Sequence, residues 1–373
     1  MKCALCLDPA KSDANLRERG FDFAFASLIF EGLTVDVEDR RQDYGEQRMV
    51  ALTGAMYRKY FQLHLPSHTL SLGPRTLLMG ILNVTPDSFS ERGRYFDRKA
   101  AVARGLEIER EGADLLDIGG ESTRPGALPV EPEEELDRTI PVIEALRAKG
   151  LRIPISIDTY KSLVAERALR SGAEIVNDVS GLRFDALMGG VVARSRAALV
   201  LMHMRGTPRT MQQLPPVRES VRTVRRGLAG SLRRALRAGI RKRQIVLDPG
   251  IGFGKTAAQN FEIVNSLHRL AALGYPILVG PSRKSFIRAI VSELSPARAA
   301  EPPRDAARKK QILHAVSEEL LFGTAAAVTA AILNGAHIVR IHDVRQMLPV
   351  VHLADQFLAS GPGSASSRQS AGR

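Results

Sequence analysis

Tryptophan is absent from this 373-residue chain, and aromatic side chains of all kinds make up only 5% of it. Proteins that bind single-stranded nucleic acid stack bases on aromatic rings, so this chain offers few platforms for such binding. The net charge of +13 still leaves an acidic partner open. Much of that charge lies between residues 222 and 243, on or just after one predicted helix. A solvated outer helix face explains this cluster more simply than an anion- or partner-binding patch does.

Cysteine is almost as scarce as tryptophan. Cys3 and Cys6 are the only two, and a single CxxC lacks the second pair that a structural zinc site uses. A chain of this length can bury a full core without disulfides. It has no run of 18 apolar residues and no charged-then-apolar signal pattern at its N-terminus. We therefore expect a cytoplasmic protein that does not bind a membrane.

From residue 76 the sequence alternates short apolar runs with amphipathic helical segments. The apolar runs are continuous, which is typical of parallel strands covered on both faces. Eight runs are predicted to be strands: 76–84, 115–121, 153–158, 175–179, 198–203, 245–248, 276–280 and 338–342. Eight strand–helix units predict an α/β fold, a (β/α)8 TIM barrel, in preference to an open doubly wound sheet.

Three parts of the chain do not follow this alternation. Residues 1–65 are predicted to be a small N-terminal extension that precedes the barrel at 76–358. Residues 294–313 are rich in proline and charge, which predicts a surface insertion within the barrel. Residues 359–373 are of low complexity and are expected to be a disordered tail.

Polar or ionisable residues stand at the C-terminal ends of the predicted strands, which meet at one mouth in such a barrel. Asp158, Asn177 and Asp248 end three strands, and Lys284 follows a fourth. An ionised carboxylate only accepts hydrogen bonds, so deep carboxylates suit a ring with N–H donors, such as the aminopyrimidinone of a pterin. The simpler alternative is that each aspartate pairs with a cation of the barrel.

A second set of residues suits phosphate. Arg340 can clamp a phosphate with its planar fork, and Asn83 can hold a magnesium ion that bridges a diphosphate. Arg340 and His342 are equally consistent with a hydrogen-bonded pair at a strand end. The glycine-bounded segment 120–126 predicts a mobile loop over a substrate. The segment GIGFGK, residues 250–255, lacks P-loop spacing, and its Phe253 is expected to form an apolar wall.

Eight motifs, in order and with matching spacing, resemble those of dihydropteroate synthases over residues 76–358. They read MGILNVTPDSFS, DIGGESTRPG, SIDTYK, IVNDVSG, LMHMRGTPRTMQ, LDPGIGFGK, SRKSFI and RIHDV. The resemblance implies a transferase that condenses 6-hydroxymethyl-7,8-dihydropterin diphosphate with p-aminobenzoate, giving 7,8-dihydropteroate and diphosphate for folate biosynthesis. It also implies Mg²⁺ as cofactor, a homodimer and competition by sulfonamide drugs.

The resemblance further implies a role for each matching residue. The implied pterin pocket consists of Asp158, Asn177, Met202, Asp248 and Lys284, of which Asp158, Asp248 and Lys284 are the implied catalytic residues. The implied diphosphate site consists of Asn83, which is also the metal ligand, with Thr123, Arg124, Arg340 and His342. The implied p-aminobenzoate site consists of Phe89, Thr123, Pro125, Phe253 and Ser285.

Two other functions stay open. Pterin-dependent methyltransferases share the barrel but deliver a methyl group. The first 55 residues resemble the beginning of BrnT-type toxin ribonucleases, through DPAKSDANLRERG and EDRRQDYGEQR, but they lack a Lys-His pair and the second half of that fold. We expect a degenerate fragment and no nucleic-acid partner. An interaction segment or a working ribonuclease are the alternatives.

Overall fold

The structure is a computed structural model that describes residues 34–38, 49–53, 58–85, 97–123, 126–294 and 306–360. The chain divides into two compact units, one formed by residues 1–57 with 360–373 and the other by residues 58–359. In the first unit, β1 (Thr34–Glu38) and β2 (Met49–Thr53) pair as an antiparallel ribbon. Most of the segment that resembles a toxin ribonuclease lies outside the described residues.

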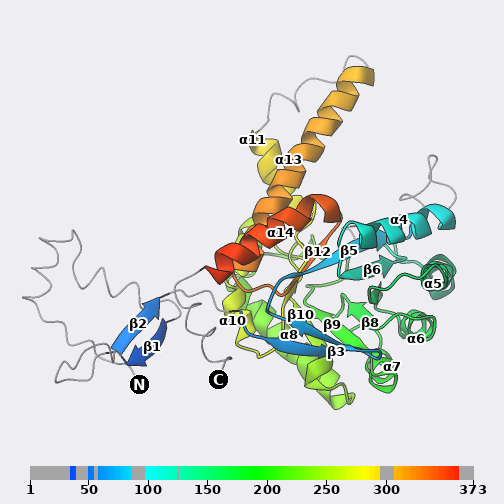
Figure 1. Ribbon diagram of the computed structural model, residues 1–373, viewed down its shortest axis with the longest axis horizontal. Coiled ribbons are helices and arrows are strands. Elements are labelled where there is room, and N and C mark those ends of the chain that lie inside the picture. The colour runs from blue at the N-terminus through cyan, green and yellow to red at the C-terminus, as the bar shows by residue number, and fades with distance from the viewer. Residues whose placement is uncertain are drawn as a thin grey trace, which may run out of the picture. The chain divides into compact units, whose positions relative to one another are not determined.

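The second unit is built on eight parallel strands, as the sequence predicts (Figure 1). They are β5 (Leu77–Asn83), β6 (Leu115–Gly119), β7 (Ile155–Asp158), β8 (Ile175–Asp178), β9 (Ala198–Met202), β10 (Ile245–Asp248), β11 (Leu278–Val279) and β12 (Ile338–Ile341). Their order in the sheet is β10-β9-β8-β7-β6-β5-β12-β11. A parallel bridge between Leu247 and Ile277 brings β10 to β11 and completes the ring. The predicted α/β barrel is therefore confirmed.

Helices surround this ring of strands (Figure 1). They are α4 (Arg98–Arg110), α5 (Pro132–Ala148), α6 (Ser162–Arg170), α7 (Met188–Ser195), α8 (Ser220–Arg237), α9 (Ala257–Asn265), α10 (Leu267–Ala271), α11 (Ser285–Leu294), α13 (Ala306–Leu333) and α14 (Val344–Ala359). In the described part of the chain, no helix is long and apolar enough to span a membrane.

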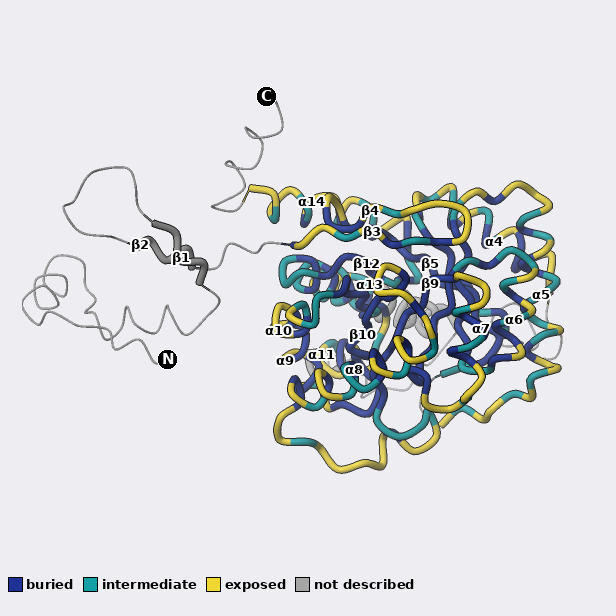
Figure 2. The backbone as a smooth tube through the Cα atoms, turned by 90° about the horizontal axis from the view of Figure 1, so that it is seen from below, coloured by how far each residue is buried: buried dark blue, intermediate teal, exposed yellow. Residues whose placement is uncertain are grey.

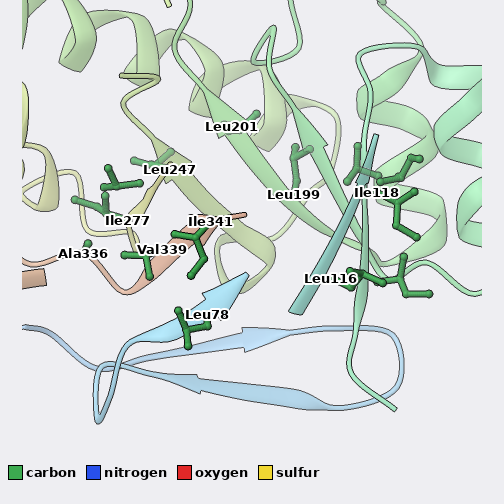
Figure 3. Close-up of a cluster of buried hydrophobic side chains, with 14 of the residues drawn as sticks. Leu78, Leu116, Ile118, Leu199, Leu201, Leu247, Ile277, Ala336, Val339 and Ile341 are labelled. Carbon is green, nitrogen blue, oxygen red and sulfur yellow. The ribbon is translucent and has the colours of Figure 1, made fainter. Parts of the chain in front are cut away.

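Side chains alternate along each strand between the helices and the inside of the barrel. Leu78, Leu116, Leu199, Leu247 and Val339 pack with the helices in the main core, and Figure 3 shows them among the labelled side chains. Their immediate neighbours along the strands fill the inside of the barrel instead. The exposed surface lies largely on the outer helices and loops, while the barrel strands are buried (Figure 2). This alternation fixes which residues near the strand ends point inward.

An antiparallel hairpin covers the end of the barrel at which the strands begin. It consists of β3 (Phe61–His64) and β4 (Thr69–Leu72), whose Leu63 and Leu72 are buried. Their cluster contains the first residues of several barrel strands, Leu77, Leu115 and Ala198 among them. The compact unit begins at Arg58, so residues 58–65 belong with the barrel, whereas the sequence predicts that they are part of the N-terminal extension.

The structure differs from the predicted surface insertion at 294–313 in the second half of that segment. Residues 295–305 lie outside the described part, but residues 306–313 form the first turns of α13. Their sequence, AARKKQIL, consists largely of strong helix formers, and these outweigh the charge that suggested a loop. In Figure 1 the N-terminal part of α13 extends beyond the ring of helices.

Candidate active site

A pocket opens at the end of the barrel where the strands terminate. Its lining comes from seven of the eight barrel strands and the loops that follow them, because the inward-facing residues of adjacent strands converge there. The lining residues are Thr123, Asp158, Asn177, Val179, Met202, Asp248, Gly250, Ile251, Phe253, Gly280, Lys284 and Arg340. All five residues of the implied pterin pocket are among them.

Arg340 is the centre of the polar network on the pocket floor. Its Nε donates to Asp117 Oδ2 over 2.5 Å, and its Nη2 donates to Asp158 Oδ2 over 2.8 Å. Asn177 Nδ2 donates to the same Asp117 oxygen over 3.1 Å. The alternative in which Asp158 pairs with a barrel cation therefore holds. Even so, Asp158 Oδ1 and Asn177 Oδ1 are buried without a hydrogen-bond partner. Such buried acceptors favour a ligand that brings donors.

Burial raises the pKa of both pocket aspartates. The pKa of Asp158 is raised to about 7 because its burial outweighs the favourable charge of Arg340, and Asp117 adds repulsion. Burial likewise raises the pKa of Asp248 to about 6, although Gly250 N donates to its Oδ1 over 2.7 Å. Two carboxyl groups that titrate near neutral pH in a pocket are typical of a functional site.

Lys284 provides a cation in the pocket lining, next to Phe253. It precedes α11, and its Nζ lies 4.0 Å from the centre of the Phe253 ring, which is a cation–π distance. Burial lowers the pKa of Lys284 to about 8, with Arg340 as a further cause. The side chain can donate to a carbonyl oxygen or ring nitrogen, and its charge balances that of Asp248.

The apolar part of the lining includes Val179, Met202 and Phe253. These three residues belong to a hydrophobic cluster that also contains Met204 and Met211. The loop that carries Phe253 is held from behind by Lys255, whose Nζ donates to the carbonyl oxygens of His203, Gly250 and Phe253 over 2.7–3.1 Å. Gly250 has a φ of 64°, and a Cβ there would lie 2.1 Å from His203 O. Only glycine fits this turn.

Three further implied substrate residues do not line the pocket. His342 follows β12 and forms a hydrogen bond with Ser282, whose Oγ lies 2.9 Å from its Nδ1. Asn83 ends β5 beside Gly119 of β6. Ser285 is exposed at the first position of α11. Phe89, Arg124 and Pro125 lie outside the described residues.

Sequence reasoning missed Asp117, which touches two of the predicted residues. It is fully buried in the middle of β6, two positions before the strand ends. The available signal was a single charged residue inside the otherwise apolar run LLDIG. A buried charge in a strand needs a partner, and that requirement pointed to another inward-facing polar residue.

A family model described as pterin binding enzyme matches residues 79–342. The chain belongs to this pterin-binding enzyme family. Its matched region contains every described pocket residue.

Several dihydropteroate synthases are similar to this family member. That of Synechocystis sp. is 44% identical over 298 residues, which cover 79% of this chain and 96% of the relative. The Xanthomonas albilineans enzyme, solved with 4-aminobenzoic acid, is 41% identical with a TM-score of 0.68, and the match covers 82% of this chain and 100% of that one. The Yersinia pestis enzyme, solved with a sulfonamide drug complex, is 35% identical with a TM-score of 0.68, covering 80% and 100%.

Proposed function

We propose that this chain condenses 6-hydroxymethyl-7,8-dihydropterin diphosphate with p-aminobenzoate, giving 7,8-dihydropteroate and diphosphate for folate biosynthesis. The observation that carries the proposal is the pair of unsatisfied acceptors, Asp158 Oδ1 and Asn177 Oδ1, in the pocket of a pterin-binding barrel. The high identity to dihydropteroate synthases over nearly their whole length supports the same transferase activity.

The pterin ring fits the deep part of the pocket. Asp248 and Asp158, once ionised, accept hydrogen bonds from the amino group and ring N–H groups, and Lys284 donates to the ring carbonyl. Met202 contributes an apolar surface on which the ring lies. These contacts fix the methylene carbon of the substrate at the mouth of the pocket.

The chemical step needs no protein nucleophile. The bond between the methylene carbon and the diphosphate oxygen breaks, and its electron pair leaves with the diphosphate. The neutral amine of p-aminobenzoate then forms the new carbon–nitrogen bond and loses a proton. The carboxylates of Asp158 and Asp248 stabilise the positive charge that develops on the pterin during this step.

The diphosphate is assigned to the rim of the pocket. Arg340 Nε and Nη2 are used by Asp117 and Asp158, so its Nη1 remains to donate to the leaving group. His342, Thr123 and Arg124 are the further anion contacts. On the p-aminobenzoate side, Phe253, Thr123, Pro125 and Phe89 enclose the ring, and Ser285 with the N–H groups that begin α11 faces the carboxylate.

Mg²⁺ is the proposed cofactor, with Asn83 as its protein ligand. The described residues contain no group of three or more His, Cys, Asp or Glu that could hold a metal ion. An amide oxygen at a strand end suits an ion that keeps water and binds mainly to the substrate's phosphates. When bound, the ion would neutralise charge on the leaving diphosphate.

Association into a homodimer is also part of the proposal. Phe322 of α13 and Leu353 and Phe357 of α14 are 71%, 58% and 60% exposed, and the two helices pack side by side. Large exposed apolar side chains on adjacent helices favour a protein contact. The cytoplasm is the proposed compartment, since the chain has only two cysteines.

The decisive experiment is a product assay with purified full-length protein. It is given the pterin diphosphate, p-aminobenzoate and Mg²⁺, and dihydropteroate and diphosphate are measured together. Equal amounts of both products support the proposal, and their loss on adding a chelator supports Mg²⁺. Methyl transfer from a methylated pterin, or RNA cleavage, with no dihydropteroate formed would establish one of the alternatives instead.

A further inference from the structure

Asp117 carries an inference that goes beyond the assigned substrate contacts. Its carboxylate is fully buried and does not line the pocket. One oxygen, Oδ2, accepts from both Arg340 Nε and Asn177 Nδ2. Asp117 thus lies behind two residues of the site and holds both.

The contact with Asn177 fixes which end of its amide faces the ligand. A carboxylate oxygen can only accept, so the NH₂ group of Asn177 must turn toward Asp117. Asn177 Oδ1 then points elsewhere and is left without a partner in the buried pocket. The opposite amide orientation would place two acceptors, Asn177 Oδ1 and Asp117 Oδ2, against each other.

We infer that Asp117 is a positioning residue that sets the hydrogen-bonding pattern of the pterin pocket. It makes Asn177 present an acceptor, and it holds Arg340 where that side chain also engages Asp158. Three acceptors on the floor, Asp158, Asn177 and Asp248, then face the ligand together. This selects a heterocycle that presents several N–H donors on one edge. The inference rests on the proposed function, because it concerns the same pocket.

Substitution of Asp117 by leucine and by asparagine provides the sharpest test. Asp117→Leu removes the acceptor that Arg340 Nε and Asn177 Nδ2 share, so the amide of Asn177 is no longer held with its oxygen toward the pocket. Asp117→Asn is the conservative variant, because its amide oxygen can take the place of Asp117 Oδ2 and accept from both donors. Its NH₂ group then takes the place of Asp117 Oδ1, which has no hydrogen-bond partner.

The measurements are kcat, the KM values of both substrates and calorimetric binding of the pterin diphosphate. Asp117→Leu should lose roughly 10- to 100-fold in kcat/KM for the pterin diphosphate, as expected when a buried hydrogen bond to a charged group is lost. Asp117→Asn should keep a kcat/KM at least tenfold higher than that of Asp117→Leu. Ser156→Ala is the matched control, because Ser156 is also buried, pairs with Asp117 across the strands and has an unsatisfied Oγ. It should stay within about twofold of the wild type.

Loss in Asp117→Leu together with retained activity in Asp117→Asn supports the positioning role. Unchanged pterin binding in a folded Asp117→Leu variant overturns the inference, as does a folded Asp117→Asn variant that loses as much as Asp117→Leu. If Asp117→Leu does not fold, calorimetry on Asp117→Asn decides: binding within tenfold of wild type supports the inference, and weaker binding overturns it. Failure of the proposed function would show differently, as a wild type that forms no dihydropteroate.

Discussion

The two ends of the barrel use buried charge in opposite ways. At the end covered by the hairpin, Asp355 accepts from Arg58 Nη2, from the backbone N–H of Thr76 and from Thr76 Oγ1, all at 2.7–2.8 Å. At the open end, Asp158 has one bonded oxygen and one buried oxygen without a partner. One aspartate is fully satisfied, and the other is not.

The same contrast holds for the cations. Arg58 donates hydrogen bonds to Gly73, Thr76, Ala336 and Asp355, and it is 6% exposed. Arg340 leaves its Nη1 without a hydrogen bond within the described residues. Satisfied groups contribute to stability, while unsatisfied ones cost stability until a ligand completes them. The difference teaches that polar residues at the closed end hold the fold, whereas those at the open end are reserved for binding.

Truncation within the hairpin should cause the largest loss of stability. Removal of residues 1–65 deletes β3 and Arg58 and exposes the residues that Leu63 and Leu65 cover. Losses of about 2–5 kcal/mol for each core leucine and about 3–5 kcal/mol for the buried ion pair exceed the stability of many domains. We expect this variant to be unfolded by circular dichroism.

Removal of residues 1–57 is the matched control for that truncation. It leaves the compact unit that begins at Arg58 intact. Dihydropteroate synthesis should stay within roughly tenfold of the full-length rate, a change of about 1.4 kcal/mol. Equal melting temperatures for the two truncations would show that the hairpin does not support the barrel. If instead only the full-length chain cleaved RNA, the N-terminal segment would be a second active unit.

The substitution Asp158→Asn tests the open end. It keeps the shape but removes a fixed negative charge opposite the developing pterin cation, and it weakens the contact with Arg340. The barrier should rise by about 2–4 kcal/mol, as for other preorganised electrostatic groups. Steady-state kcat, with the melting temperature measured in parallel, checks this. Turnover close to wild type in the folded variant would exclude Asp158 from catalysis.

The pH dependence should show a smaller effect. Asp158 and Asp248 both act as carboxylates in the proposed reaction, so kcat/KM for the pterin diphosphate should rise with pH through their raised pKa values of about 7 and about 6. Lys284 donates only when protonated, so the rate should fall above its lowered pKa of about 8. The alkaline limb approaches a tenfold change per pH unit, and the acid limb becomes steeper below the pKa of Asp248, where both carboxylates are protonated. In Lys284→Arg the alkaline limb should disappear while the acid limb stays; an unchanged alkaline limb would assign it to another group.

The basic helix α8 should show the smallest effect. Arg225, Arg226, Arg233 and Arg237 are exposed, while Val224 and Leu228 on the opposite face are buried. Replacing Arg225 and Arg226 by Gln should change the free energy of unfolding by less than about 0.5 kcal/mol and leave turnover unaltered. Retention of RNA on a column, measured against salt, gives the second readout. A strong, salt-dependent retention that this variant loses would make the helix a nucleic-acid surface.

Much of the barrel could be predicted because its strands are continuous apolar runs. The polar residues at the strand ends then located the pocket: Asp158 and Asp248 end their strands, Asn177 is the next to last residue of its strand, and all three line the pocket. The hairpin could not be predicted in this way, because FQLH and TLSL are short and mix polar with apolar residues. Their apolar side chains are explained only by packing on the end of the barrel, which is a tertiary contact.

The polar network shows the same limit at the level of single residues. Sequence places Arg340 at a strand end but does not reveal that Asp117 and Asp158 share it, because those partners lie more than 180 positions away. Asp117 lies in the middle of a strand, so the expectation that site residues lie at strand ends does not identify it. The start of α13 differs from the prediction because charged residues that favour helix also occur in surface loops, so their charge alone does not distinguish the two.

The most direct test compares Arg58→Met with Asp158→Asn in the same two measurements, the free energy of unfolding and kcat/KM for the pterin diphosphate. Arg58→Met removes one partner of a buried ion pair, so the free energy of unfolding should fall by about 3–5 kcal/mol, with kcat/KM within about threefold of wild type where the protein is folded. Asp158→Asn should do the reverse, with stability unchanged or raised by about 1 kcal/mol and kcat/KM reduced at least thirtyfold. If both variants lose stability and activity in the same proportion, the division of the barrel into a supporting end and a binding end is wrong.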